Sequence, residues 1–201
     1  MTPVRTQTAT PAAAAPSAGP SRRGWHRLEA WAKCPQSHSY RYNLGLEPVR
    51  VPEPLALGSL VHIGLMWHYL ALAGRSVEDP VECMRTAPER IAYCFERARV
   101  IFLAYREHYP VEPFDVLDVE REFDVRVGGH LHTQRMDLVV RWTGPVVAID
   151  HKSSGGSLAA ASREWEMHGQ FISMELLGRH VLAPTYDLPW GGTVVNVVGT
   201  G

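Results

Sequence analysis

The chain has 201 residues, 45% of them hydrophobic, which is enough for one domain with a buried core. Its formal net charge is −1 and its pI is about 6.8, so the overall charge gives no support for nucleic-acid binding and any basic surface must be local. No apolar run approaches the roughly 20 residues that a membrane-spanning helix needs, so we expect no membrane association.

The first 20 residues differ in composition from the rest of the chain. They are rich in Thr, Ala, Pro, Ser and Gly, which is typical of a disordered tail. The short alanine run between Pro11 and Pro16 is unlike the apolar region of a signal peptide. We therefore expect a single ordered domain over residues 21–201.

Helices are predicted in the first half of this domain, because apolar residues recur there at helical spacing. Gly74 is a natural stop for the second of them, and Pro110 ends the third. In chain order, the expected elements are a helix over 21–31, an extended, proline-broken segment over 44–54, and helices over 57–73 and 87–108.

From Val116 the apolar period changes to two, which predicts strands. Turns are expected at the two glycines 128–129 and at Thr143-Gly144-Pro145. The predicted elements are strands over 116–127, 130–140 and 146–152, a helix from 160 to about 180, and a strand over 193–198. A last strand that joins after a helix makes the sheet mixed, so we predict an α/β core with an N-terminal helical extension. The sequence stops abruptly after this last strand, which is what we expect from a truncated chain.

Three of the charged residues on the hairpin predicted for 130–152 are candidates for a site. Asp137 is in the first strand, and Asp150 and Lys152 end the second, where alternation points them to the same side. Two carboxylates and an ammonium at a sheet edge form a site for a hard divalent cation and a water molecule, which is the chemistry of phosphodiester hydrolysis. The alternative for Asp150 and Lys152 is a surface salt bridge, which is common and stabilises little.

Five short segments carry a further signal when they are taken together. They are Cys34-Pro35 with Tyr40, Leu57 to His62, Val119 to Phe123, Met136-Asp137 with Ile149 to Lys152, and Gln170 within His168 to Phe171. Their order and spacing over residues 21–180 resemble the PD-(D/E)xK nuclease superfamily, specifically its RecB-like branch, which includes the CRISPR-associated exonucleases. The resemblance implies a restriction-endonuclease-like core, a mixed sheet flanked by helices.

Two segments depart from the family's pattern. The family usually has Gly two or three residues before its first Asp, where this chain has Gln134-Arg135-Met136. The glutamine often precedes a Tyr by four residues, and this chain has Met174 there. Neither departure removes a catalytic group, so both concern the contacts to the substrate.

The expected metal is Mg²⁺ or Mn²⁺, since both prefer oxygen ligands. Asp137 and Asp150 would supply carboxylate oxygens, and the backbone carbonyl of His151 a further one. The resemblance adds His62 as a ligand, and an imidazole ligand favours tolerance of Mn²⁺. The alternative for His62 is a histidine that faces apolar neighbours in the core.

Three further residues have expected roles at the same site. Lys152 would orient or deprotonate the attacking water, or stabilise charge on the phosphate. Gln170 would hold the water or a phosphate oxygen, and its alternative is an ordinary polar helix residue. Glu120 is a candidate carboxylate behind the ligands, although solvent exposure is as consistent with its sequence as with that of Glu122.

Aromatic and basic residues alternate in the N-terminal part of the domain. Basic side chains can follow a phosphate backbone, and aromatic rings can stack on unpaired bases. Tyr40 and Arg41 are the best candidates for DNA contacts. The whole set is Arg22, Arg23, Trp25, Arg27, Trp31, Lys33, Tyr40, Arg41, Tyr42 and Arg50.

The cysteines indicate a compartment and argue against one cofactor. Cys34, Cys83 and Cys94 form no CxxC pair, and an odd number fits a reducing cytoplasm better than a disulfide framework. An iron–sulfur cluster usually needs four thiolates, so we expect none in this chain. His130 and His132 share a strand face, but zinc is not expected there without a nearby cysteine pair.

The sequence therefore predicts a metal-dependent DNA nuclease, with an exonuclease preferred, in recombination, repair or phage DNA metabolism. DNA is the expected partner, and a helicase or recombination protein is a second one. One alternative is a catalytically inactive nuclease-fold module that binds DNA or supports assembly. Another is an unrelated hydrolase that uses a carboxylate–histidine metal site on a small phosphoester.

Overall fold

The computed structural model describes residues 23–156 and 168–200. The tail predicted for residues 1–20 and the first part of the helix predicted from residue 160, with Trp165, lie outside these ranges. The four strands are β1 (Asp115–Val127), β2 (His130–Arg141), β3 (Val146–Ser154) and β4 (Trp190–Gly199). The helices are α1 (Trp25–Lys33), α2 (Pro35–His38), α3 (Glu53–Leu72), α4 (Pro80–Arg85), α5 (Glu89–Ala92), α6 (Phe95–His108), α8 (Gly169–Leu177) and α9 (Ala183–Tyr186), with π-helical turns η1 (Ser39–Asn43) and η2 (Gly178–Leu182).

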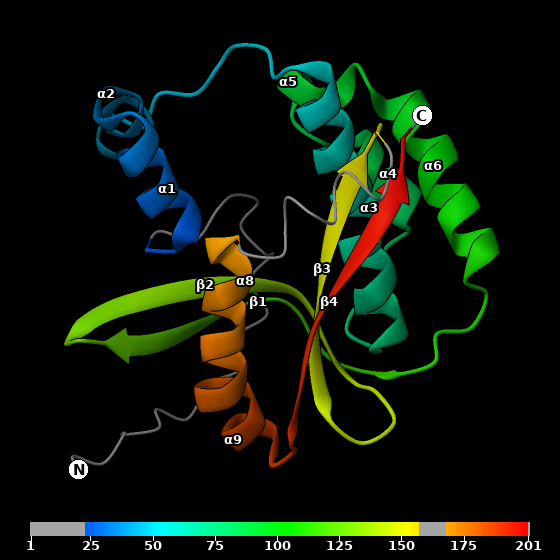
Figure 1. Ribbon diagram of the computed structural model, residues 1–201. Helices are drawn as coiled ribbons and strands as arrows, with labels where there is room; N and C mark the ends of the chain where they lie inside the picture. Colours follow the sequence, from blue (N-terminus) through cyan, green and yellow to red (C-terminus); the bar gives the residue numbers. More distant parts are fainter. Residues whose placement is uncertain (1–22, 157–167, 201) are drawn as a thin grey trace.

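One mixed sheet with the order β1-β2-β3-β4 forms the centre of the molecule. β1 and β3 both pair antiparallel with β2, and β4 pairs parallel with β3 after the crossover through α8 and α9. Helices α3 and α6 lie on one side of β3 and β4, and α8 and α9 lie on the other (Figure 1). The predicted α/β fold, with a restriction-endonuclease-like mixed sheet and an N-terminal helical extension, is confirmed.

The sheet is not continuous along its length. β2 pairs with β3 only from Arg141–Val146 to Leu138–Ile149, whereas β4 pairs with β3 up to Ser154. The residues of β2 before Leu138 pair with β1 but not with β3. The hairpin of β1 and β2 curves away from β3 (Figure 1). Asp137 directly precedes Leu138 and Asp150 directly follows Ile149, the last residues of β2 and β3 that pair, so both lie in the fork between the strands.

Two apolar clusters fill the two sides of the sheet. The larger cluster joins α3, α4 and α6 to residues such as Leu138 and Ile149, and the smaller joins α8 and η2 to residues such as Val139 and Ala148. Since neighbouring residues of β2 and β3 enter different clusters, both strands are buried on both faces. This explains why their sequences are almost continuously apolar.

Several predicted helix limits need correction. α3 begins at Glu53 rather than Leu57, because Pro54 occupies its first turn, where a proline costs no hydrogen bond. The helix predicted over 87–108 is divided into α5 and α6 at Tyr93-Cys94, where the Cys94 N–H bonds to Ile91. The missed helix α4 has a recognisable start, since the Asp79 side chain accepts hydrogen bonds from the backbone N–H groups of Val81 and Glu82.

Helix α3 also corrects the expectation about apolar segments. It has 20 residues and a mean hydropathy of 1.5, so by length and composition it could cross a membrane. In the structure it is instead the central helix of the larger cluster. Its buried residues are Ala56, Leu57, Gly58, Leu60, Val61, Gly64, Leu65 and Tyr69.

Candidate active site

The fork between β2 and β3 exposes backbone groups that a continuous sheet would pair. The N–H of His151 donates to Asp137 Oδ2 over 2.9 Å, so a side chain takes the place of a strand partner. The carbonyl of His151 accepts a hydrogen bond from His62 Nε2 over 2.6 Å. One peptide segment of β3 therefore contacts both the first predicted carboxylate and the predicted histidine.

Helix α3 can place His62 there because it approaches β3 very closely. A Cβ atom on Gly58 would lie 2.5 Å from Ser153 Oγ, so a larger residue here would require the serine hydroxyl to move. His62 follows four residues later, on the same face of the helix. Its Nδ1 lies 3.7 Å from Asp137 Oδ2, and because Nε2 donates to the His151 carbonyl, a neutral His62 presents the lone pair of Nδ1 toward this carboxylate.

Asp150 and Lys152 face the opposite side of β3, toward α8. Lys152 Nζ lies 2.7 Å from Asp150 Oδ2 and donates to Gln170 Oε1 over 3.2 Å. The amide of Gln170 in turn donates to Asp150 Oδ1 over 2.6 Å. The three side chains form a closed triangle in which Asp150 is only 2% exposed, so this pair is not the surface salt bridge of the alternative interpretation.

Glu120 enters the site from β1. It lies opposite Asp137, between the strand pairs Val119–Leu138 and Arg121–Met136, and its backbone is left-handed with φ 49°. A non-glycine residue in this region costs about 1–2 kcal/mol, and such strain is common at functional sites. One ligand atom each of His62, Glu120 and Asp137 lies within 4.8 Å of the other two.

The carboxylates of the site repel one another. Burial, followed by the negative charge of Asp137, raises the pKa of both Glu120 and Asp150 above the ordinary carboxyl range. The ammonium of Lys152 opposes this shift for Asp150, and the guanidinium of Arg135 opposes it for Glu120. A divalent cation would neutralise this excess of negative charge, so the donor set fits Mg²⁺ or Mn²⁺.

The structure brings His62, Asp137 and the carbonyl of His151 together as predicted, and both oxygens of Asp150 contact Gln170 and Lys152. Glu120, which we expected behind the ligands, offers an oxygen within 4.8 Å of ligand atoms of His62 and Asp137. The sequence contains the signal for this, because the Gly128-Gly129 turn fixes a register that places Glu120 opposite Asp137.

The model of the PD-(D/E)XK nuclease superfamily matches residues 25–181. The chain belongs to this superfamily. A comparison with curated protein sequences finds no match. As a member of the superfamily, the protein has a nuclease fold, and the fork between β2 and β3 brings together the two segments that resemble the two halves of the superfamily's signature.

The two departures from the family's pattern have structural explanations in this nuclease fold. Met174, at the position of the usual Tyr, is 1% exposed in the smaller apolar cluster, so it packs in the core. Gln134 accepts a hydrogen bond from Ser173, one turn of α8 after Gln170. Met136 is fully buried. These contacts attach α8 to β2 and thereby fix the position of Gln170.

The N-terminal extension of the nuclease lies beside the triangle of Asp150, Lys152 and Gln170. Trp25 packs against Gly169, where a Cβ atom would lie 2.3 Å from its ring, and Glu29 lies 3.6 Å from His168 Nε2. Tyr40 is 47% exposed in η1, and the Arg41 guanidinium lies over the ring of Tyr42. In α1, α2 and η1 no described residue is buried, so this part contributes surface rather than core.

The remaining polar candidates lie away from the fork. Cys34 is exposed at the start of α2, Cys83 is half-buried in α4, and Cys94 is buried beside α6. His132 lies within hydrogen-bonding distance of Ser173 Oγ, on the side of the sheet that α8 covers. His130 is exposed at the tip of the β1–β2 hairpin.

Proposed function

We propose that the protein is a metal-dependent deoxyribonuclease that hydrolyses phosphodiester bonds. The observation that carries the proposal is the convergence of His62, Glu120 and Asp137 on one side of the fork with the Asp150–Lys152–Gln170 triangle on the other. These residues come from α3, β1, β2, β3 and α8, so packing alone gives no reason for so many polar groups to meet. Buried polar clusters with raised carboxyl pKa values mark functional sites more often than structural ones.

His62, Asp137, Glu120 and the carbonyl of His151 would hold the ion, with Asp150 beside them. A bound Mg²⁺ or Mn²⁺ supplies Lewis acidity, which polarises a phosphate oxygen and makes a bound water more acidic. Net hydrolysis consumes one water: its oxygen bonds to phosphorus, the ester P–O bond breaks, and the two new ends carry a phosphate and a hydroxyl.

The triangle supports an orienting role for Lys152. Lys152 Nζ lies 2.7 Å from Asp150 Oδ2 and donates a hydrogen bond to Gln170 Oε1. A remaining N–H group can donate to the attacking water or to a phosphate oxygen. Gln170 holds both partners in place, so its role is to fix the geometry of the lysine and the aspartate.

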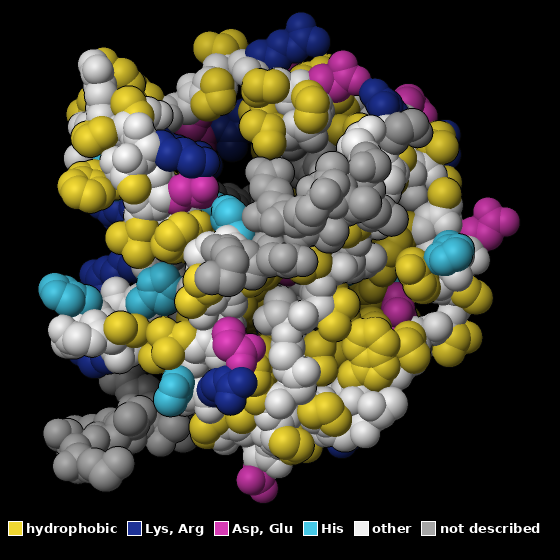
Figure 2. Space-filling view, viewed as in Figure 1, with side chains coloured by type: hydrophobic (Ala, Val, Ile, Leu, Met, Phe, Trp, Pro, Cys, Tyr) yellow, Lys and Arg dark blue, Asp and Glu magenta, His cyan; other side chains and the backbone are white. Residues whose placement is uncertain are grey.

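An exonuclease of the RecB-like branch is the finer form of the proposal. The N-terminal extension is attached at both ends, by hydrogen bonds of Arg23 with Thr133 and of Val51 with Arg90 and Tyr93. Figure 2 shows a hollow in the surface between this extension and the upper part of the molecule. A free DNA end could enter such a hollow, with Tyr40 and Arg41 on the extension as contacts. A helicase or recombination protein would supply that end in cytoplasmic recombination, repair or phage DNA metabolism.

A nuclease assay with end-labelled linear and circular DNA tests the proposal with Mg²⁺ and Mn²⁺ in parallel. We expect release of nucleotides from linear DNA and loss of this activity in Asp137→Asn and Lys152→Ala. The control is Glu122→Gln, on the exposed part of β1. Retained activity in Lys152→Ala would refute the mechanism, and cleavage of circular DNA would refute a pure exonuclease. Stable DNA binding by the wild-type protein without cleavage would support an inactive module.

A further inference from the structure

The side chain of His151 lies on the opposite side of β3 from Asp150 and Lys152, inside the larger apolar cluster. Its ring stacks on Tyr69 with 5.6 Å between centroids and 15° between planes, and it meets His62 edge-on at 6.0 Å. It is 3% exposed, and burial lowers its pKa to about 4, so it is neutral. A buried polar ring between a metal ligand and a tyrosine needs a partner, and β4 provides one.

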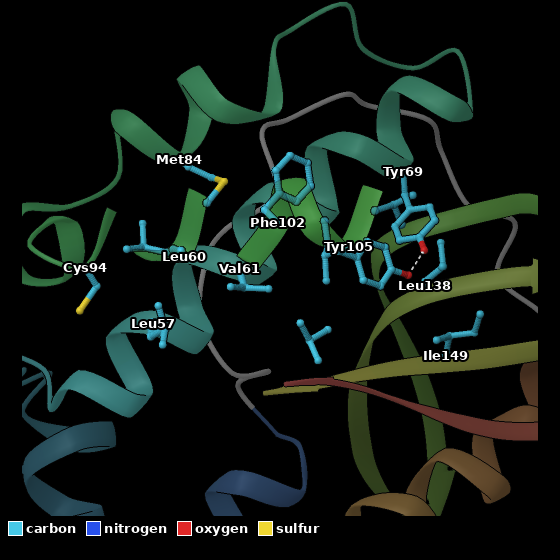
Figure 3. Packing of buried hydrophobic residues seen from close by; sticks show 14 of the residues in the cluster. Leu57, Leu60, Val61, Tyr69, Met84, Cys94, Phe102, Tyr105, Leu138 and Ile149 are labelled. Carbon is cyan, nitrogen blue, oxygen red and sulfur yellow. Dashed lines mark hydrogen bonds between the residues drawn. The ribbon is translucent and has the colours of Figure 1, made fainter. Parts of the chain in front are cut away.

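Asn196 of β4 is the register partner of His151 and lies 3.0 Å from its Nδ1 through Nδ2. The same amide nitrogen donates to Tyr105 Oη over 3.0 Å. Tyr105 and Tyr69 share a hydrogen bond of 2.7 Å, drawn as the dashed line in Figure 3, and Tyr69 donates to Glu112 over 2.8 Å. A chain of hydrogen bonds therefore connects His151 to the surface carboxylate of Glu112.

The donor and the acceptor in each of these hydrogen bonds follow from the last bond, between Tyr69 and Glu112. Because Tyr69 donates to Glu112, its oxygen accepts the hydrogen of Tyr105, and the oxygen of Tyr105 accepts from Asn196. The second N–H of Asn196 must then go to His151, whose Nδ1 is the unprotonated nitrogen. The amide orientation and the histidine tautomer are thus fixed together.

The backbone of His151 forms part of the candidate site. Its N–H holds Asp137 and its carbonyl contacts His62, so a rotation of this peptide segment would move both proposed ligands. We propose that Asn196 is a positioning residue of the metal site, which acts with Tyr105 and Tyr69 by locking the His151 side chain and, through it, the carbonyl and N–H in the fork. This inference rests on the proposed function, because it concerns the ligands of that metal.

Asn196→Ala removes both amide donors, so we expect weaker metal binding in a folded protein. Calorimetric titration with Mn²⁺ should show a 10–100-fold rise in the dissociation constant, the usual cost of losing a group that orients a metal ligand. Tyr105→Phe, which loses one hydroxyl of the chain, should show a smaller rise. Tyr109→Phe, whose ring lies 4.9 Å from that of Tyr105 but outside the hydrogen-bond chain, is the matched control and should match the wild type.

A second measurement needs no metal. The nitrogen chemical shifts of His151 should show an unprotonated Nδ1 in the wild type, and Asn196→Asp, which offers only acceptors, should move the hydrogen to Nδ1. His151→Leu assigns the signals.

The outcomes separate the two proposals. Wild-type Mn²⁺ binding that is unchanged in Asn196→Ala, or a lower melting temperature as its sole effect, would overturn the positioning role and leave the nuclease proposal intact. If the wild-type protein binds no Mn²⁺, the proposed function fails and the positioning role fails with it. A wild-type His151 with a protonated Nδ1 would overturn the hydrogen-bond chain itself, whatever the metal titration shows.

Discussion

The side-chain amide of Gln170 donates a hydrogen bond to Asp150 Oδ1 over 2.6 Å, and this contact joins α8 to β3. Asp150 is nearly inaccessible to water, so its charge depends on the partners that the protein supplies. The carbonyl of the same amide accepts from Lys152. One side chain thus determines how the proposed catalytic pair is oriented.

Gln170→Met should impair catalysis more than folding. The substitution keeps most of the volume and removes both hydrogen bonds, which costs about 1–3 kcal/mol for a buried partner left unsatisfied. We expect kcat to fall at least about tenfold while the circular dichroism spectrum stays unchanged, because Lys152 keeps only its ion pair with Asp150. Steady-state kinetics on linear DNA test this, and a kcat within twofold of the wild type would contradict the role of Gln170.

Glu120→Gln and Glu122→Gln form a matched pair on β1. Glu120 faces Asp137 and His62, whereas Glu122 is exposed and lies 3.8 Å from Arg135. We expect Glu120→Gln to weaken Mn²⁺ binding about 10–100-fold, since a neutral amide replaces a charged oxygen ligand. The Glu122→Gln variant should bind as the wild type does. Equal dissociation constants in both variants, measured by calorimetry, would place Glu120 outside the ligand set.

Gly169→Ala should disturb the attachment of α1. The new Cβ would lie 2.3 Å from the ring of Trp25, and such overpacking typically costs about 1–3 kcal/mol. Trp25→Ala in the same chain should remove the clash, so the double variant should lose less stability than the sum of the single ones. Gly199→Ala, where no heavy atom lies within 4 Å, is the control. Additive losses in urea unfolding would show that the two residues do not interact.

Asp118 should make stability depend on acid pH. Burial alone would raise its pKa, but hydrogen bonds from Tyr186, Arg75 and Arg121 outweigh burial and hold the pKa below its ordinary value. A lowered pKa means that the unfolded chain binds the proton first, so this stabilisation is complete above about pH 4, the unfolded value, and is lost as the pH falls through the folded value.

The corresponding variant is Asp118→Asn, which leaves two arginines without their carboxylate. We expect a loss of roughly 2–3 kcal/mol at pH 7, below the range for a fully buried pair because both arginines are partly exposed. The difference from the wild type should be constant between pH 5 and 8 and should shrink below about pH 4. Urea unfolding across this range measures it. If the difference in the free energy of unfolding between the wild type and the variant grew on acidification, this prediction would be contradicted.

The sequence by itself determined the candidate site residues and the elements on which most of them lie. The period-two pattern after Val116 predicts β1, β2 and β3, and alternation predicts that Asp150 and Lys152 face the same way, as they do. These properties are local, because strand pairing at a two-residue turn and the pleat follow from adjacent residues. Helix limits were less certain, since a proline can begin a helix as well as end one.

Only the tertiary structure decided how these residues meet. The divergence of β2 from β3 at the residues before Leu138, the close approach of α3 at Gly58, and the pairing of Asn196 with His151 all involve segments far apart in the chain. Such contacts depend on how side chains fill the space between whole elements, which local patterns do not contain. For this reason Glu120 lies close to His62 and Asp137, and Asp150 contacts Gln170 and Lys152, an arrangement that the motif alone does not reveal.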